Sequence, residues 1–156
     1  MKNALFIVLF LLLASSIKAQ NQLEITAQSA HCFNYEDNLL GTNINLLWDK
    51  TKGYKTGFGA GLYYAYECPA AELNLAIKKN MPVKNSIHPF WELNLGSTSL
   101  IDECVFSILM HPKFGFEFPY INGSFQASIG YRVDYFPSWT ECAHNISLSF
   151  GYTFDL

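Results

Sequence analysis

The chain has 156 residues, of which 50% are hydrophobic, 16% aromatic and only 15% charged. This composition is typical of one folded domain and excludes an intrinsically disordered chain. Ten basic and 13 acidic residues give a net charge of -3, so the sequence offers no basic surface for phosphates and predicts no nucleic-acid partner.

The first 19 residues have the pattern of a secretory signal peptide. Lys2 and Asn3 form a short polar start, residues 4–14 are apolar, and Ala19 is a small residue before a polar stretch. This apolar run is too short to span a bilayer as a helix, which takes about 20 residues. No cysteine follows the cleavage site to carry a lipid. We therefore expect Sec export, removal of residues 1–19 and one mature domain over 20–156.

After the signal, apolar and polar residues alternate, and no window shows the sustained period of an amphipathic helix. Near the C-terminus, for example, Ile146, Leu148 and Phe150 interleave with Ser147 and Ser149. Because strand side chains point alternately to opposite faces, such a segment has one apolar and one polar face. Eight such segments follow one another: 22–30, 39–48, 54–66, 73–82, 90–101, 107–118, 124–136 and 146–156. Most have about the ten residues that a tilted strand needs to cross a membrane.

The two faces of these segments differ in charge. Lys79 is the one charged residue on the apolar face, whereas the other face carries Glu24, Lys55, Lys78, Glu92, Lys113, Glu117, Arg132, Asp134 and Asp155. A soluble sandwich or lipocalin would turn its charges outward and its apolar side chains inward. The inverted pattern predicts an all-β fold, an eight-stranded antiparallel up-and-down transmembrane β-barrel with its charges in the lumen.

The lumen charges are expected to form a network of salt bridges that plugs the barrel. Its predicted members are Lys55, Lys78, Glu92, Lys113, Glu117, Arg132 and Asp134. Arg132 is the expected centre, because one guanidinium group can bridge several carboxylates, here those of Glu92, Glu117 and Asp134. His111 is interpreted as a hydrogen-bonded member of the same plug.

The connections predict an orientation. Segments 49–53, 82–89 and 119–123 fall at the end that holds both termini, which is periplasmic in outer-membrane barrels. The connections near 31–38, 67–72, 102–106 and 137–145 then face the exterior. Outward aromatic residues gather at the two levels expected of interfacial belts: Trp48, Tyr54, Trp91, Phe118, Phe125 and Phe154 at the periplasmic level, and Tyr64, Tyr66 and Tyr135 at the outer one.

The C-terminal strand carries a local motif. Ser149, Gly151, Phe154 and Leu156 match a pattern of polar, glycine, aromatic and hydrophobic residues at fixed spacing. With this motif the chain resembles the small eight-stranded outer-membrane barrels of Gram-negative bacteria, similar to the transmembrane domain of outer-membrane protein A and porin-like in pattern. The resemblance implies a place among outer-membrane lipids and insertion by the barrel-assembly machinery, with these four residues as the signal.

Four cysteines, Cys32, Cys68, Cys104 and Cys142, recur about one hairpin apart and are expected on the extracellular connections. An even number in an exported chain predicts two disulfides. Pairing Cys32 with Cys142 is favoured, because strands one and eight must pair to close the barrel, and Cys68 then pairs with Cys104. The alternative, Cys32 with Cys68 and Cys104 with Cys142, is nearly as plausible. A metal site with His31 and His144 is the weaker alternative, because the close ligand spacing of such sites is absent.

The same connections are acidic. They carry Glu36, Asp37, Glu67, Glu72, Asp102, Glu103 and Glu141 and no lysine or arginine. These carboxylates can hold cations, meet a basic partner or only keep the surface soluble.

We interpret the chain as a monomeric structural or surface-recognition protein, without a cofactor and without a catalytic site. A narrow channel for small solutes is the first alternative. A lipid-modifying outer-membrane enzyme is the second, and it is disfavoured because His144 and Ser147 fall on opposite faces of one strand. The sequence does not identify the ligand of the rim.

Overall fold

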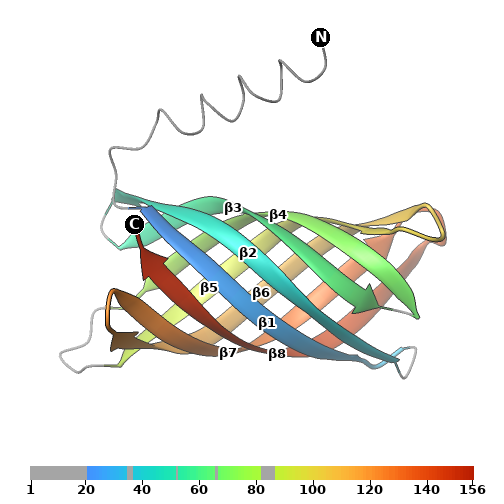
Figure 1. The fold of residues 1–156 in the computed structure, drawn as a ribbon. Coiled ribbons are helices and arrows are strands. Elements are labelled where there is room, and N and C mark those ends of the chain that lie inside the picture. Colours follow the sequence, from blue (N-terminus) through green and yellow to red (C-terminus); the bar gives the residue numbers. More distant parts are fainter. Residues whose placement is uncertain (1–20, 35–36, 52, 66, 82–86) are drawn as a thin grey trace, which may run out of the picture.

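The computed structural model describes residues 21–34, 37–51, 53–65, 67–81 and 87–156. Its strands are β1 (Asn21–Cys32), β2 (Asp37–Thr51), β3 (Tyr54–Ala65), β4 (Cys68–Asn80), β5 (His88–Leu100), β6 (Val105–Tyr120), β7 (Gly123–Phe136) and β8 (Glu141–Asp155). They form one closed antiparallel barrel in chain order (Figure 1). The predicted all-β up-and-down barrel is confirmed. Among the described residues, no helix is long and apolar enough to span a membrane.

The seam between the first and last strands closes the barrel. β1 pairs with β8 from Gln22 opposite Asp155 to Cys32 opposite Asn145. The backbone N–H of Leu156 also donates to the carbonyl oxygen of Asn21 at 2.9 Å. Asn21 and the C-terminus therefore lie at the same end, which we call the terminal mouth, and the opposite end is the distal mouth (Figure 1). Full closure leaves no free sheet edge, as a barrel surrounded by lipid requires.

The strands are longer at the distal mouth than the sequence predicted. β4 begins at Cys68 instead of residue 73, and β8 begins at Glu141 instead of residue 146. The distal connections are shorter than predicted and comprise residues 33–36, 66–67, 101–104 and 137–140. We had assigned these stretches to loops because the apolar alternation stops there. A ladder of backbone hydrogen bonds does not depend on that alternation, so it continues to the mouth.

The barrel carries its apolar side chains outside and its charges inside, as predicted. Ile129 and Phe150 are 54% and 64% exposed, whereas Glu24 and Arg132 are each 0% exposed. Along every strand buried and exposed positions largely alternate, which is the two-residue period of a strand. The outer face is therefore suited to hydrocarbon, and the lumen to charge.

Aromatic side chains gather around the terminal mouth. The rings of Tyr54 and Trp91 lie 6.3 Å apart between centroids, and Tyr152 stacks between Phe125 and Phe154 at 4.9 and 4.6 Å. At the distal end, Tyr64 and Tyr135 are outward and exposed. Tyr66 lies outside the described residues. Rings at two levels are typical of the interfacial belts of membrane barrels.

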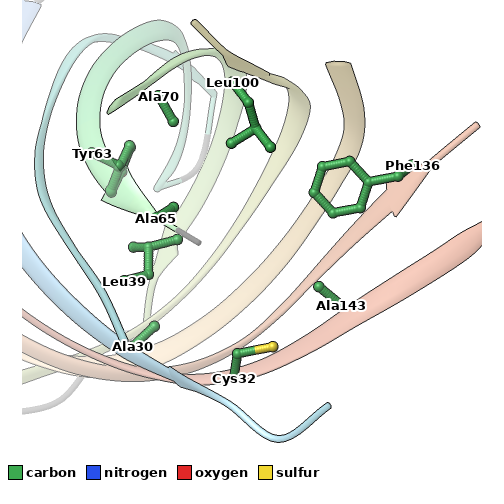
Figure 2. Packing of buried hydrophobic residues seen from close by; sticks show 9 residues of the cluster. All are labelled: Ala30, Cys32, Leu39, Tyr63, Ala65, Ala70, Leu100, Phe136 and Ala143. Atoms are coloured by element: carbon green, nitrogen blue, oxygen red, sulfur yellow. The ribbon is translucent and has the colours of Figure 1, made fainter. Parts of the chain in front are cut away.

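Apolar side chains are buried inside the barrel at the distal mouth. This distal cluster comprises Ala30, Cys32, Leu39, Tyr63, Ala65, Ala70, Leu100, Phe136 and Ala143, contributed from around the ring (Figure 2). We had expected polar residues throughout the lumen. The members occupy inward positions at the distal ends of the strands; six of them lie within the predicted segments, and Cys32, Ala70 and Ala143 lie where the strands extend beyond them.

We expect Ile129→Asp to prevent stable insertion and its neighbour Ser128→Asp to be tolerated. A charge on the lipid face in mid-bilayer costs about 2 kcal/mol, whereas residue 128 points to a lumen that already holds charges. The measurement is the fraction of heat-modifiable, folded protein after refolding into lipid vesicles. Equal losses in both variants would contradict the facing of β7.

Candidate functional site

Arg132 is the centre of the charged layer nearest the distal cluster. Its Nε and Nη2 donate to the two carboxylate oxygens of Asp134 at 2.7 and 3.0 Å, and Nη1 donates to Glu72 at 2.6 Å. Nη2 also donates to the hydroxyl of Thr98 at 2.7 Å. The guanidinium carbon lies 5.0 Å from the centroid of the Tyr63 ring. All three nitrogen atoms of this fully buried guanidinium therefore donate to acceptors, which offsets the cost of burying its charge.

A second layer surrounds Lys78, nearer the terminal mouth. Its Nζ lies 2.7 Å from Glu24, 2.7 Å from Glu117 and 2.6 Å from the amide oxygen of Gln126. The same ammonium lies 4.2 Å from the centroid of Phe90. Lys113 forms a separate pair with Glu92 at 2.6 Å. The Lys78 pairs join β4 to β1 and β6, so they depend on the closed barrel, whereas Lys113 and Glu92 lie opposite each other on the consecutive strands β5 and β6.

The structure brings together some of the predicted network residues and places others with different partners. Arg132 and Asp134 pair as expected, but Glu92 and Glu117 pair with lysines instead of Arg132. The missing partner is Glu72, which we had placed in the acidic rim. Because β4 begins earlier than predicted, Glu72 is a strand residue that points inward and is 2% exposed.

Lys55 and Asp155, also assigned to the lumen face, lie at the terminal mouth. A polar cavity of about 320 Å³ opens there, lined by Asn21, Gln22, Asp49, Lys55, Asp155 and Leu156. Lys55 is half-buried, and Gln22 donates to the carboxylate of Asp155. This cavity lies where the lumen meets the terminal side.

His111 is buried in the lumen. Its Nε2 lies 2.7 Å from the hydroxyl oxygen of Ser147, and the two residues are 1% and 0% exposed. His144 is on the outer face, where its Nδ1 lies 2.8 Å from the hydroxyl of Tyr131. The predicted separation of His144 and Ser147 onto opposite faces is confirmed. The His111–Ser147 pair, which sequence spacing did not reveal, is enclosed by the barrel wall.

Most of the predicted acidic rim lies at the distal mouth. Glu67, Asp102, Glu103 and Glu141 are exposed there and Asp37 is half-buried, whereas Glu36 lies outside the described residues. Among the described residues, no three His, Cys, Asp or Glu side chains are arranged to hold a metal ion.

Three of the four cysteines lie in strands, whereas we had predicted them in connections. Cys32 ends β1, Cys68 begins β4 and Cys142 is the second residue of β8, so that only Cys104 lies in a connection. All four are free thiols in this structure. The two predicted disulfides are therefore not formed in it.

The strand register rules out the pairing of Cys32 with Cys142 that we had favoured. Cys32 is buried inside the barrel in the distal cluster, together with Ala143. Cys142 precedes Ala143 on β8, so its side chain lies on the outer face. A disulfide needs converging side chains with Cβ atoms about 4 Å apart, which opposite faces of one sheet do not provide.

Cys68 and Cys104 are placed differently. The Sγ atom of Cys68 lies 3.8 Å from the carboxylate of Glu103, the residue before Cys104. The backbone N–H of Ile101 donates to the carbonyl of Pro69 at 2.9 Å, which holds the 101–104 connection against the start of β4. The two thiols therefore belong to adjoining segments of the rim.

The residues of the C-terminal motif occupy the seam strand. Ser149 is buried on the lumen side, and Phe154 is outward in the aromatic group of the terminal mouth. At Gly151 a Cβ would come within 2.6 Å of the Thr26 side chain on β1. Leu156 donates its N–H to Asn21. The glycine therefore permits the close approach of β8 to β1.

No family model matches the chain, and no curated protein matches it either. Solved structures do match. The N-terminal β-barrel domain of OprF from Pseudomonas aeruginosa is 15% identical with a TM-score of 0.58, over 88% of this chain and 100% of that one. Neisserial surface protein A is 14% identical with a TM-score of 0.57, over 87% and 96%. A de novo designed transmembrane β-barrel is 10% identical with a TM-score of 0.56, over 86% and 95%.

These matches define the class of fold. The chain has the fold of the eight-stranded outer-membrane β-barrels, and its apolar outer face and charged lumen agree with that class. A designed barrel matches about as well as the two natural ones, so the similarity shows the architecture alone.

We expect Arg132→Met to lower the free energy of unfolding by about 3 to 5 kcal/mol, because it leaves the buried Glu72 and Asp134 carboxylates without their cation. Urea titration in detergent, followed by heat modifiability, measures the loss. Lys79→Met is the control, since this half-buried lysine on the outer face contacts Tyr54 but no carboxylate of the network, and we expect less than about 1 kcal/mol there. Similar losses in both variants would contradict a central role for Arg132.

Proposed function

We propose that the protein is an integral outer-membrane β-barrel of a Gram-negative bacterium, with a structural or surface-recognition role. The observation that carries the proposal is the inverted barrel with a filled lumen. Its apolar wall fits a lipid environment, and its interior is occupied by paired charges and the distal cluster. The surface left for recognition is the distal rim, which faces the exterior in this orientation.

Sec export, removal of residues 1–19 and insertion by the barrel-assembly machinery belong to the same proposal. Residues 1–19 lie outside the described residues. The seam position of Ser149, Gly151, Phe154 and Leu156 supports the assembly role, because the last strand must find β1 to close the barrel. We propose a monomer among outer-membrane lipids, since one chain closes its own sheet.

The rim is proposed as a recognition surface for a basic partner. The exposed carboxylates of Glu67, Asp102, Glu103 and Glu141 surround the distal mouth, and no described lysine or arginine lies in the distal connections. Charge of one sign at an exposed rim attracts partners of the opposite sign and raises their association rate. The ends of the strands hold these side chains on a rigid frame.

A narrow channel is the competing function, and conductance separates the two. We expect the purified barrel in planar lipid bilayers to give no steady, large conductance, because two buried charge layers and the distal cluster fill the lumen. Detergent without protein is the control. Steady channels from the unmodified barrel would overturn the plug and favour the channel.

We also propose one disulfide at the rim, between Cys68 and Cys104. The adjoining positions of these residues support it, and an exterior location is oxidising. On whole cells, a membrane-impermeant maleimide is expected to label Cys104 only after treatment with a reductant, and Cys32 not at all, because that thiol is 1% exposed. A Cys104→Ser variant identifies the labelled residue. Labelling of Cys104 without reductant would disprove the disulfide, and no labelling in either state would contradict the exterior rim.

A further inference from the structure

Three asparagine side chains point their oxygen atoms at one place in the middle of the lumen. Asn43, Asn45 and Asn74 lie on β2 and β4, on either side of Gly59 in β3. A Cβ atom at Gly59 would lie 2.7 Å from Asn74 Oδ1 and 3.0 Å from Asn43 Oδ1, and it would overlap Asn45 Oδ1. The three oxygens therefore converge on the point that only a glycine leaves open.

Carboxylates fix the orientation of these amides. Asn43 and Asn74 donate their Nδ2 groups to Glu72 at 3.1 and 2.8 Å, and Asn45 donates to Glu24 at 3.0 Å. Turning an amide around would place its oxygen against a carboxylate. The nitrogen atoms thus face the acids, and the oxygen atoms must face Gly59.

All three oxygens are buried acceptors that lack a donor. Asn43, Asn45 and Asn74 are 4%, 0% and 4% exposed, and no described residue donates a hydrogen bond to their Oδ1 atoms. A buried polar atom without a partner costs about 1 to 3 kcal/mol, so three at one point are costly. One water molecule has two hydrogens and can satisfy only two of them.

The charge of the lumen favours a cation at this point. The fully buried charges are the acids Glu24, Glu72, Glu92, Glu117 and Asp134 against the bases Lys78, Lys113 and Arg132. At the terminal mouth the half-buried Lys55 and Asp49 cancel each other, so the excess of two negative charges remains. Glu24 and Glu72, which hold the three amides, are the acids nearest the convergence point, and their other oxygens are bound by Lys78 and Arg132.

We propose that Asn43, Asn45 and Asn74 form a binding site for a single hard monovalent cation, an alkali-metal ion, at Gly59. Oxygen atoms are the ligands that hard cations prefer, and a cation satisfies all three acceptors at once. The ligands are neutral amides, whereas sites for Ca²⁺ and Mg²⁺ rely on direct carboxylate ligands, so the site suits a single charge. The bound ion would tie β2 to β4 across β3.

Refolding in different salts tests the site. The mature chain is refolded from urea into detergent micelles in NaCl, KCl or N-methyl-D-glucamine chloride at equal ionic strength, with a chelator to remove divalent ions. Ligand linkage predicts that the folding equilibrium constant rises about tenfold for each tenfold increase in the free alkali-cation concentration once that concentration is well above the dissociation constant of the site. Equal stability in all three salts would overturn the proposal and leave water as the occupant.

Matched variants locate the effect. Asn74→Leu removes one ligand, and Asn94→Leu is its control, because Asn94 is also buried and donates at 2.8 Å to the glutamate two residues before it. We expect Asn74→Leu to lose the difference between alkali and organic cation, and Asn94→Leu to keep it. If Asn74→Leu does not fold, the same salt comparison is made with Gly59→Ala. The nearest atoms to its methyl group are the oxygen ends of the three asparagine side chains, so the methyl group would fill the site. Retention of the full salt difference by the deciding variant would refute the assignment.

A direct observation completes the test. Crystals of the unmodified barrel grown with Tl⁺ or Rb⁺ should show one anomalous peak within coordination distance of the three Oδ1 atoms. A peak there supports the site, and a lumen without one in both crystals contradicts it.

Discussion

Backbone pairing in a medium without water is the constraint on which the rest of this structure depends. Lipid offers no hydrogen bonds, so every strand must find two neighbours, and β1 must meet β8. Once the wall is closed and its outer face is apolar, a charged side chain in the middle of a strand can only lie inside. The lumen then has to neutralise its own charges, because it is cut off from solvent.

The pairing inside the lumen follows from that enclosure. Arg132 needs two carboxylates and a hydroxyl, and it obtains them from β4, β5 and its own strand. Lys78 likewise binds acids from β1 and β6. A lumen with five buried acids and three buried bases is not neutral. Asn43, Asn45 and Asn74 bind Glu24 and Glu72 through their nitrogen atoms. Their oxygen atoms are then left as buried acceptors without a donor among the described residues.

The sequence predicted the architecture because one physical rule acts on every strand. The two-residue period, with its apolar face outward and its charged face inward, predicts the number of strands, their order and which side chains point into the lumen. These predictions are confirmed. The ends of strands were wrong at the distal mouth, because a backbone ladder continues where side-chain alternation stops. Glu72, Cys32, Cys68 and Cys142 were misplaced for this reason, and Arg132 was consequently given the wrong glutamates.

Partners within the lumen were beyond sequence reasoning for a different reason. The alternation along a strand predicts which side chains point into the lumen. Which of them come into contact depends on the strand register and on their position along the barrel axis. Glu72 and Arg132 are 60 positions apart, and Lys78 and Glu24 are 54 apart. Such contacts exist only after the sheet has closed in one register, since a shift by one residue would turn Glu72 or Arg132 outward into lipid. The charges therefore penalise every register that is shifted by an odd number of residues, because such a shift would place them in lipid, and the ion pairs of Glu72 and Lys78 further favour the observed register over even shifts.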